Sequence, residues 1–425
     1  MATMLIQGGR VIDPANQLDQ LLNLVIEDGV IAEITTGIPR TDEVIMAQGM
    51  IVSPGLVDLH VALRDPGGEE DEGTASGTKA ALAGGFTTIA ALPDTNPVVD
   101  NRASAEFVIL QAERAGYCRV VPLGAITRNH QGEELADLGQ LAAGGAGGFT
   151  DANRAVQSAE IMRRALEYAR MLNRPIFAVP QDATLSAGGL MHEGYYSTVL
   201  GLRGIPAAAE EIMVGRDIAL AELTGGHVHL MNISTRNSVE ELKRAKGMGI
   251  RVTADVTPHH LAITDASLVT YDTNLKVLPP LRSQEHVDAL IEGLRDGTID
   301  SISSDHRPFA SEKKSREFDQ VPFGVSSIET ALAVVATVLV DGGLLDWPDL
   351  LRLLTVNPAK ILGIDAGTLN IGRPADLALI DPAAHWIVDT RQFFSRGHNT
   401  PFQGKTLRSR VMKTIVGGEV RFSRQ

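Results

Sequence analysis

Residues 227–258, HVHLMNISTRNSVEELKRAKGMGIRVTADVTP, contain two largely apolar runs on either side of a stretch with helical periodicity. The runs His227–Ser234 and Val252–Pro258 have the length and composition of buried strands. The stretch Ser238–Lys246 between them is predicted to form a helix. A strand, a helix and a second strand in this order indicate parallel strands joined by a right-handed crossover.

The same alternation continues on both sides of this unit, with further helices predicted at Ser158–Leu172 and Ala207–Leu223. The other predicted strands are Leu56–Leu63, Thr87–Leu92, Arg119–Ile126, Gly147–Asp151, Pro175–Pro180 and Ser301–Asp305. Eight such repeats predict an α/β protein with a (β/α)8 TIM-type barrel. An open doubly wound sheet is the alternative fold. A dinucleotide-binding form of it is disfavoured, because no G-x-G-x-x-G motif opens a helix after the first strand.

Both ends of the chain are instead rich in short predicted strands. These are Met4–Gln7, Leu22–Glu27 and Val30–Ile34 at the start, and Ala375–Ile380, Trp386–Asp389 and Val411–Phe422 at the end. The dipeptides Asp28-Gly29 and Gly417-Gly418 predict hairpin turns. We therefore expect a small β-sandwich-like domain built from residues 1–53 and 366–425, and a barrel over residues 54–365.

The composition limits which binding partners and which cellular compartment we expect for this chain. A net charge of -14 over 425 residues argues against nucleic acid and anionic membranes as partners. The single cysteine, Cys118, cannot form an internal disulfide, which is typical of a reducing compartment. The first residues lack the pattern of a signal peptide, and no run has the length of a membrane span. These features predict a cytoplasmic protein.

Reactive groups of such barrels lie at the carboxyl ends of the strands. The predicted strand ends carry His60, Arg64, Asp94, Asp151, Asn232, His259, His260 and Asp305. Carboxylates and imidazoles in these places are the residue types that bind divalent metal ions and move protons.

Several of these ends belong to longer motifs. GLVDLHVALRDPG at residues 55–67 is followed by ALPDTNPV, HEGYYSTVLGLRGIPAAAE, VTADVTPHHL, PPLR and SSDHRPF. In this order the chain is similar, over nearly its whole length, to the dihydroorotases of the amidohydrolase superfamily. The segment HEGYYSTVLGLRGIPAAAE favours that branch over hydantoinases and allantoinases. The resemblance implies a binuclear zinc site that hydrolyses or forms the cyclic amide of dihydroorotate.

The resemblance also implies six metal-ligand positions, and this chain departs from three of them. His60, the bridging carboxylate Asp151 and the strand-eight carboxylate Asp305 match the family, and Asp305 is also the implied catalytic residue. The family's other three ligands are imidazoles, which are replaced here by Ala62, Val179 and Asn232. The remaining ligands predict either no metal or one zinc ion held by His60, Asp151 and Asp305.

The implied substrate positions are altered as well. Arg64 matches the residue that holds the substrate carboxylate. Asp94 and Leu278 replace asparagines, Phe309 replaces a histidine, and Arg307 replaces a small residue. A change of substrate would have left the metal site alone. Losses at both kinds of position therefore indicate a site that no longer catalyses the reaction.

Two functions follow as predictions. The first is a non-catalytic dihydroorotase-like protein, since inactive homologues of this family associate with aspartate transcarbamoylase in pyrimidine biosynthesis; it implies a homo- or hetero-oligomer. The alternative is an active dihydroorotase with one metal, in which Asp305 is the general base and Arg64 binds the substrate carboxylate. A third hypothesis is that the emptied pocket binds a small regulatory ligand.

Purely structural roles compete with these assignments. His60 and Asp151 are equally well read as buried groups that hydrogen-bond to each other, and Asp305 and His306 as a structural pair. His227 and His229 lie at the start of their strand and are expected to be structural. At most one of His259 and His260 is expected to reach the pocket. The acidic run 69–72 is expected to be a solvated loop.

Overall fold

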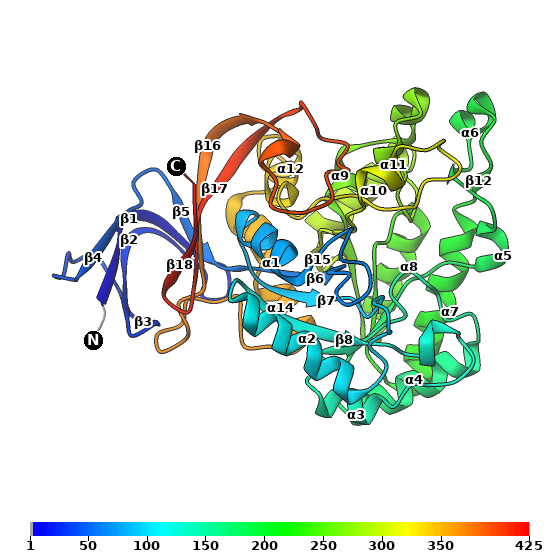
Figure 1. The fold of residues 1–425 in the computed structure, drawn as a ribbon, viewed down its shortest axis with the longest axis horizontal. Coiled ribbons are helices and arrows are strands. Elements are labelled where there is room, and N and C mark those ends of the chain that lie inside the picture. The colour runs from blue at the N-terminus through cyan, green and yellow to red at the C-terminus, as the bar shows by residue number, and fades with distance from the viewer. Residues whose placement is uncertain (1–2, 425) are drawn as a thin grey trace.

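The computed structural model describes residues 3–424, and the largest part of it is a barrel sheet of eight parallel strands (Figure 1). The strands follow one another around the sheet in chain order. They are β6 (Leu56–Val61), β7 (Phe86–Ala91), β8 (Arg119–Gly124), β9 (Gly148–Phe149), β10 (Ile176–Ala178), β13 (Val228–Leu230), β14 (Val252–Val256) and β15 (Ser301–Ile302). A bridge between Val61 and His306 joins the last strand region to the first, which nearly closes the barrel. The predicted barrel is therefore confirmed.

All eight predicted barrel strands are present, but their pairing ends earlier than the apolar runs do. Two of the ends have a direct backbone cause. Asn232 has φ 54° and Asp305 has φ 47°, both in the left-handed region that strand pairing does not use. The chain therefore turns out of the sheet at the positions where the candidate site residues lie.

Helices cover the outside of the barrel (Figure 1). The α-helices are α1 (Thr74–Ala83), α2 (Arg102–Ala115), α3 (Leu138–Ala143), α4 (Ala159–Met171), α5 (Ala183–Ser186), α6 (Tyr195–Leu200), α7 (Ala208–Thr224), α8 (Arg236–Gly247), α9 (Pro258–Ala262), α10 (Gln284–Arg295), α11 (Ser311–Lys314), α12 (Ala331–Val335), α13 (Trp347–Leu354) and α14 (Val356–Leu362). Helix α4 shows why such segments pack. Its buried residues Met162, Ala165, Leu166 and Ala169 form one apolar stripe at helical spacing. None of the helices within residues 3–424 is both long and apolar enough to cross a membrane.

Strands from both ends of the chain form a second sheet beside the barrel (Figure 1). Its order is β18 (Glu419–Ser423), β17 (Thr406–Val416), β16 (Leu377–Ile387), β5 (Ile51–Pro54), β1 (Thr3–Asp13), β2 (Leu18–Glu27) and β3 (Val30–Thr35), and β4 (Glu43–Met46) pairs with β1. Ile6 and Leu24 share one apolar cluster with Leu377 and Ile415, so the two ends form a common core. The proposed domain boundaries at residues 53 and 366 stay a prediction.

The predicted hairpins are both present. Asp28 and Gly29 have positive φ angles of 48° and 84° and connect β2 to β3, while Gly417 and Gly418 connect β17 to β18. One strand prediction was wrong. Residues 386–389 were expected to form a separate strand, but residues 386 and 387 continue β16, which bends through irregular pairing between Asp381 and His385.

Candidate functional site

His60 lies at the carboxyl end of β6 and is wholly buried. Its Nε2 is 2.7 Å from Oδ2 of Asp255, and its Nδ1 is 3.5 Å from Oδ1 of Asp305. Burial alone would favour the neutral ring, but the charge of Asp255 and hydrogen bonds to Asp255 and Asp305 outweigh it and raise the pKa of His60 to about 10. The ring is therefore held between two carboxylates of the protein itself.

Asp255 lies in the middle of the barrel, on β14, and connects two histidines. Its Oδ2 is 2.8 Å from Nε2 of His229, and its Oδ1 accepts a hydrogen bond of 2.8 Å from the backbone N–H of Asn232. His229 in turn contacts Oγ1 of Thr253 through Nδ1. Burial opposes the charge of Asp255, but the charge of His60 and the hydrogen bonds from the two rings hold its pKa below the ordinary value. The structural role expected of His229 is thus present, and it reaches the candidate site through Asp255.

Arg307 connects the strand-eight carboxylate to the altered substrate position. Its Nε donates to Oδ1 of Asp305 at 2.9 Å, and its Nη1 is 3.4 Å from Oδ2 of Asp94. The same Oδ2 of Asp94 accepts a hydrogen bond of 2.9 Å from Arg64, whose guanidinium also lies 5.0 Å from the ring centre of Phe309. Arg64, the expected carboxylate-binding residue, is therefore paired with a carboxylate of the protein itself.

Asp151, the implied bridging carboxylate, makes local hydrogen bonds. Its Oδ1 accepts from the backbone N–H groups of Ile126 and Thr127, both at 2.9 Å, and its Oδ2 accepts from the hydroxyl of Thr127. Burial raises the pKa of Asp151 despite these bonds. The expectation that His60 and Asp151 bond to each other is wrong, because His60 pairs with Asp255 and Asp151 accepts from residues 126–127.

The implied positions that lost their polar groups are filled by apolar packing. Ala62 and Val179 contribute to one apolar cluster inside the barrel. Leu278 lies on the wall of a cavity of about 740 Å³, together with Asp151, His130 and Lys276. Asn232 uses its backbone N–H for Asp255, while its side-chain Oδ1 has no hydrogen-bond partner among the described residues. The cavity therefore lies next to Asp151, and Leu278 places an apolar side chain on its wall at one implied substrate position.

The side chains present do not fit the metal centre that the family resemblance implies. Within residues 3–424, no three His, Cys, Asp or Glu side chains are arranged to hold one metal ion. Of the three remaining ligands, His60 and Asp305 lie together, whereas Asp151 is bonded to residues 126–127. The one-metal site predicted from His60, Asp151 and Asp305 is not formed in this arrangement.

The two adjacent histidines that follow β14 are both buried, on the short helix α9. His260 contacts Oγ1 of Thr257 and the carbonyl oxygen of Pro279. Neither ring nitrogen of His259 has a hydrogen-bond partner among the described residues. Burial lowers the pKa of His259 well below its ordinary value, so the ring is neutral. His260 is therefore structural, and His259 is the one without an assigned partner.

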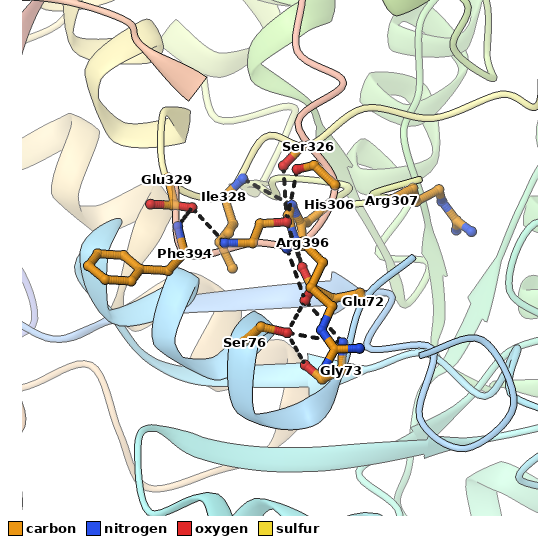
Figure 2. Close-up of polar contacts among 12 residues, drawn as sticks. Glu72, Gly73, Ser76, His306, Arg307, Ser326, Ile328, Glu329, Phe394 and Arg396 are labelled. Carbon is orange, nitrogen blue, oxygen red and sulfur yellow. Dashed lines mark hydrogen bonds and ion pairs between the residues drawn. The ribbon is translucent and has the colours of Figure 1, made fainter. Parts of the chain in front are cut away.

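Two structural expectations for nearby residues were wrong. Asp305 and His306 do not pair with each other, because His306 contacts Glu72 instead. Glu72, the last residue of the acidic run, is completely buried and Asp71 nearly so. Figure 2 shows Glu72 surrounded by hydrogen-bond donors from α1, from the loop after β15 and from residues 395–396. The four consecutive acids at residues 69–72 indicated exposure to solvent. These donors instead pair with the carboxylate of Glu72 inside the protein.

Sequence reasoning missed two central residues. Asp255 lies inside an apolar run and away from the predicted strand ends, and a lone acid within that run was the available signal. Glu210 was missed although its motif was noted. It accepts hydrogen bonds from Ser234 and Thr235 and pairs with the buried Arg282. The motifs around residues 210, 234 and 282 therefore hold one another in place.

Comparison with known proteins agrees with this architecture. An L-hydantoinase (dihydropyrimidinase) from Arthrobacter aurescens has a TM-score of 0.89 at 24% sequence identity, covering 99% of this chain and 96% of that chain. A D-hydantoinase from Thermus sp. has a TM-score of 0.84 at 22% identity, covering 98% and 94%. At this identity the likeness shows the fold alone, which this chain shares with these hydantoinases.

Sequence comparison then gives the family. A dihydro-orotase-like family model matches residues 49–238. Dihydroorotases from Syntrophus aciditrophicus and Pelotomaculum thermopropionicum are 46% and 48% identical over 420 and 418 residues, each covering 98% of both chains. The chain belongs to the dihydroorotase-like family.

Proposed function

We propose that this chain is a dihydroorotase-like protein of pyrimidine biosynthesis that does not catalyse the hydrolysis of dihydroorotate. Its relatives named dihydroorotase support the place in metabolism. The observation that carries the non-catalytic part is the pairing of His60, whose Nε2 is 2.7 Å from Asp255. In this arrangement Nε2 of His60 is occupied by Asp255 and does not face a metal position.

The second part of the proposal is a partner. We propose that the chain acts as a structural or regulatory subunit of an assembly with aspartate transcarbamoylase, which supplies the preceding intermediate. This part rests on the family resemblance. The pairing of Arg64 and His60 with carboxylates of the protein itself supports it, because a site without free catalytic groups leaves the outer surface as a basis for function.

The alternative is a working dihydroorotase, and the names of the relatives favour it. It requires a rearrangement of three contacts: His60 must leave Asp255, Arg307 must leave Asp305, and Asp151 must leave Thr127. His60 and Asp305 are already adjacent, which is the structural feature in favour of this alternative.

One assay separates the two functions. Hydrolysis of dihydroorotate and cyclisation of carbamoyl aspartate are measured on the full chain with added zinc, beside Asp305→Ala and a dihydroorotase of known activity. We expect no turnover above the Asp305→Ala background. Turnover of roughly 1 per second or faster that is lost in Asp305→Ala would establish the enzyme.

The partner is tested separately. The chain is mixed with aspartate transcarbamoylase from the same organism, and both co-elution and transcarbamoylase activity are measured. We expect a complex and a change in activity or stability of the transcarbamoylase. Separate elution with unchanged activity would exclude the proposed assembly.

A further inference from the structure

We propose that Arg307 is a built-in cation that neutralises the carboxylates of the barrel mouth, so that this chain folds and stays folded without a metal ion. The inference deepens the proposed function, on which it rests in part, since both require a site that no longer depends on metal. Its evidence is separate, because it comes from how the remaining acids are paired.

The side chain of Arg307 is only 6% exposed and lies between two acids. Nε is 2.9 Å from Oδ1 of Asp305, and Nη1 is 3.4 Å from Oδ2 of Asp94. Asp305 occupies an implied metal-ligand position, so a guanidinium contacts a carboxylate that the family resemblance implies would bind a metal ion. A planar guanidinium suits this place, because it can donate to two carboxylates at once and keeps its charge when buried.

The backbone around Arg307 is shaped to hold it. Its N–H donates to the carbonyl oxygen of Val325 at 2.8 Å, and Asn399 accepts from the N–H of Phe309 at 2.9 Å. Gly324 lies against the start of the side chain, where a Cβ would come within 2.7 Å of Cβ of Arg307. Gly324 also has φ 141°, which other residues rarely adopt. The close approach therefore needs glycine at this position.

Two guanidinium groups lie beside the carboxylates at this end of the network. Arg64 and Arg307 both contact Oδ2 of Asp94, and Arg307 also contacts Oδ1 of Asp305. Loss of one cation would leave a buried carboxylate unpaired, which is strongly destabilising.

The experiment is a double-mutant cycle on the full chain, followed by urea unfolding. Arg307→Met, Asp305→Asn and the double variant are compared with the wild type, and each is measured with and without a chelator. We expect Arg307→Met to raise the unfolding equilibrium constant at least tenfold more in the wild-type chain than in the Asp305→Asn chain. The chelator is expected to leave the wild-type unfolding midpoint unchanged.

Arg295→Met is the matched control, because Arg295 forms an exposed ion pair with Glu292. It is expected to shift the midpoint very little. If Arg307→Met does not fold, Arg307→Lys replaces it in the cycle. We expect this substitution to reduce stability less than Arg307→Met would, and to reduce it less in the Asp305→Asn chain than in the wild-type chain.

An equal effect of the Arg307 substitution in both chains would overturn the inference, as would a chelator-sensitive wild type. Turnover of dihydroorotate by a chain that shows the expected coupling would instead overturn the proposed function alone.

Discussion

Glu72 and His306 join the loop after β6 to the loop after β15, with Nε2 of His306 3.4 Å from Oε2 of Glu72 (Figure 2). Nδ1 of His306 accepts a hydrogen bond from the backbone N–H of Ser327 at 3.1 Å, so Nε2 is the ring nitrogen that donates to Glu72. The same carboxylate accepts from the hydroxyls of Ser76 and Ser395. Glu72 therefore connects the first and last barrel loops to the C-terminal segment.

Replacing Glu72 with glutamine is expected to destabilise the protein. One carboxylate oxygen becomes an NH2 group that faces the donors Ser76, Ser395 and His306, so at least one buried donor loses its acceptor. We expect a loss of about 2 kcal/mol in the free energy of unfolding, measured by urea denaturation. Glu70→Gln, two residues away and exposed, is the control and should change it by less than about 0.5 kcal/mol. Equal effects of the two substitutions would contradict the burial of Glu72.

Glu329 predicts a pH dependence of stability. Burial raises its pKa from 4.5 to about 8, although the backbone N–H groups of Phe394 and Ser395 donate to it (Figure 2). The folded protein thus keeps a proton that the unfolded chain releases near pH 4.5. The contribution of Glu329 to the free energy of unfolding is fully present below pH 4.5 and decreases as the pH rises to about 8.

Glu329→Gln should remove that decrease. The variant is expected to be more stable than the wild type at pH 8 by about 2 kcal/mol, and to differ little from it at pH 4.5. Thermal unfolding across this pH range measures the difference, with the exposed Glu317→Gln as control. A wild type and variant that keep parallel pH profiles would rule out the raised pKa.

Asp94→Asn restores the residue that the family resemblance implies, yet it should destabilise this chain. Arg64 and Arg307 both contact Oδ2 of Asp94, and an amide cannot neutralise two guanidinium groups. We expect a loss of about 3 kcal/mol in the free energy of unfolding. Asp288→Asn, on the exposed side of α10, is the comparison. An Asp94→Asn chain as stable as the wild type would show that the two arginines have other partners in solution.

Asp255→Asn tests the pairing of the two histidines. The carboxylate is completely buried and contacts His60 and His229 at 2.7 and 2.8 Å. Its removal leaves the imidazolium of His60 with only the longer contact to Asp305, so we expect a loss of about 3 kcal/mol in urea unfolding. Circular dichroism at low urea would verify that the variant starts from a folded barrel. No measurable loss would mean that the network around Asp255 is not formed.

The sequence predicted the strands, the turns and the positions of the site residues better than it predicted which side chains contact one another. Periodicity located the barrel strands, and hairpin dipeptides located the turns at residues 28–29 and 417–418, because both signals are local. The partner of His60 depends on which side chain faces it across the barrel, and strand order alone does not state this. Asp151 therefore seemed a suitable partner, whereas Asp255 is the one within reach. Burial of Glu72 was hidden for the same reason, since two of its partners, His306 and Ser395, lie more than two hundred positions away.

The second sheet places β5 between β1, from the start of the chain, and β16, from near its end. During synthesis, residues 51–54 leave the ribosome more than three hundred residues before their partner Leu377–Ile380 exists. One edge of β5 thus stays unpaired until translation is almost complete, and an open strand edge is a site for pairing with other chains. A chain that terminates before residue 377 would carry that edge permanently, so premature termination late in the gene should yield aggregated protein even when the whole barrel has been made.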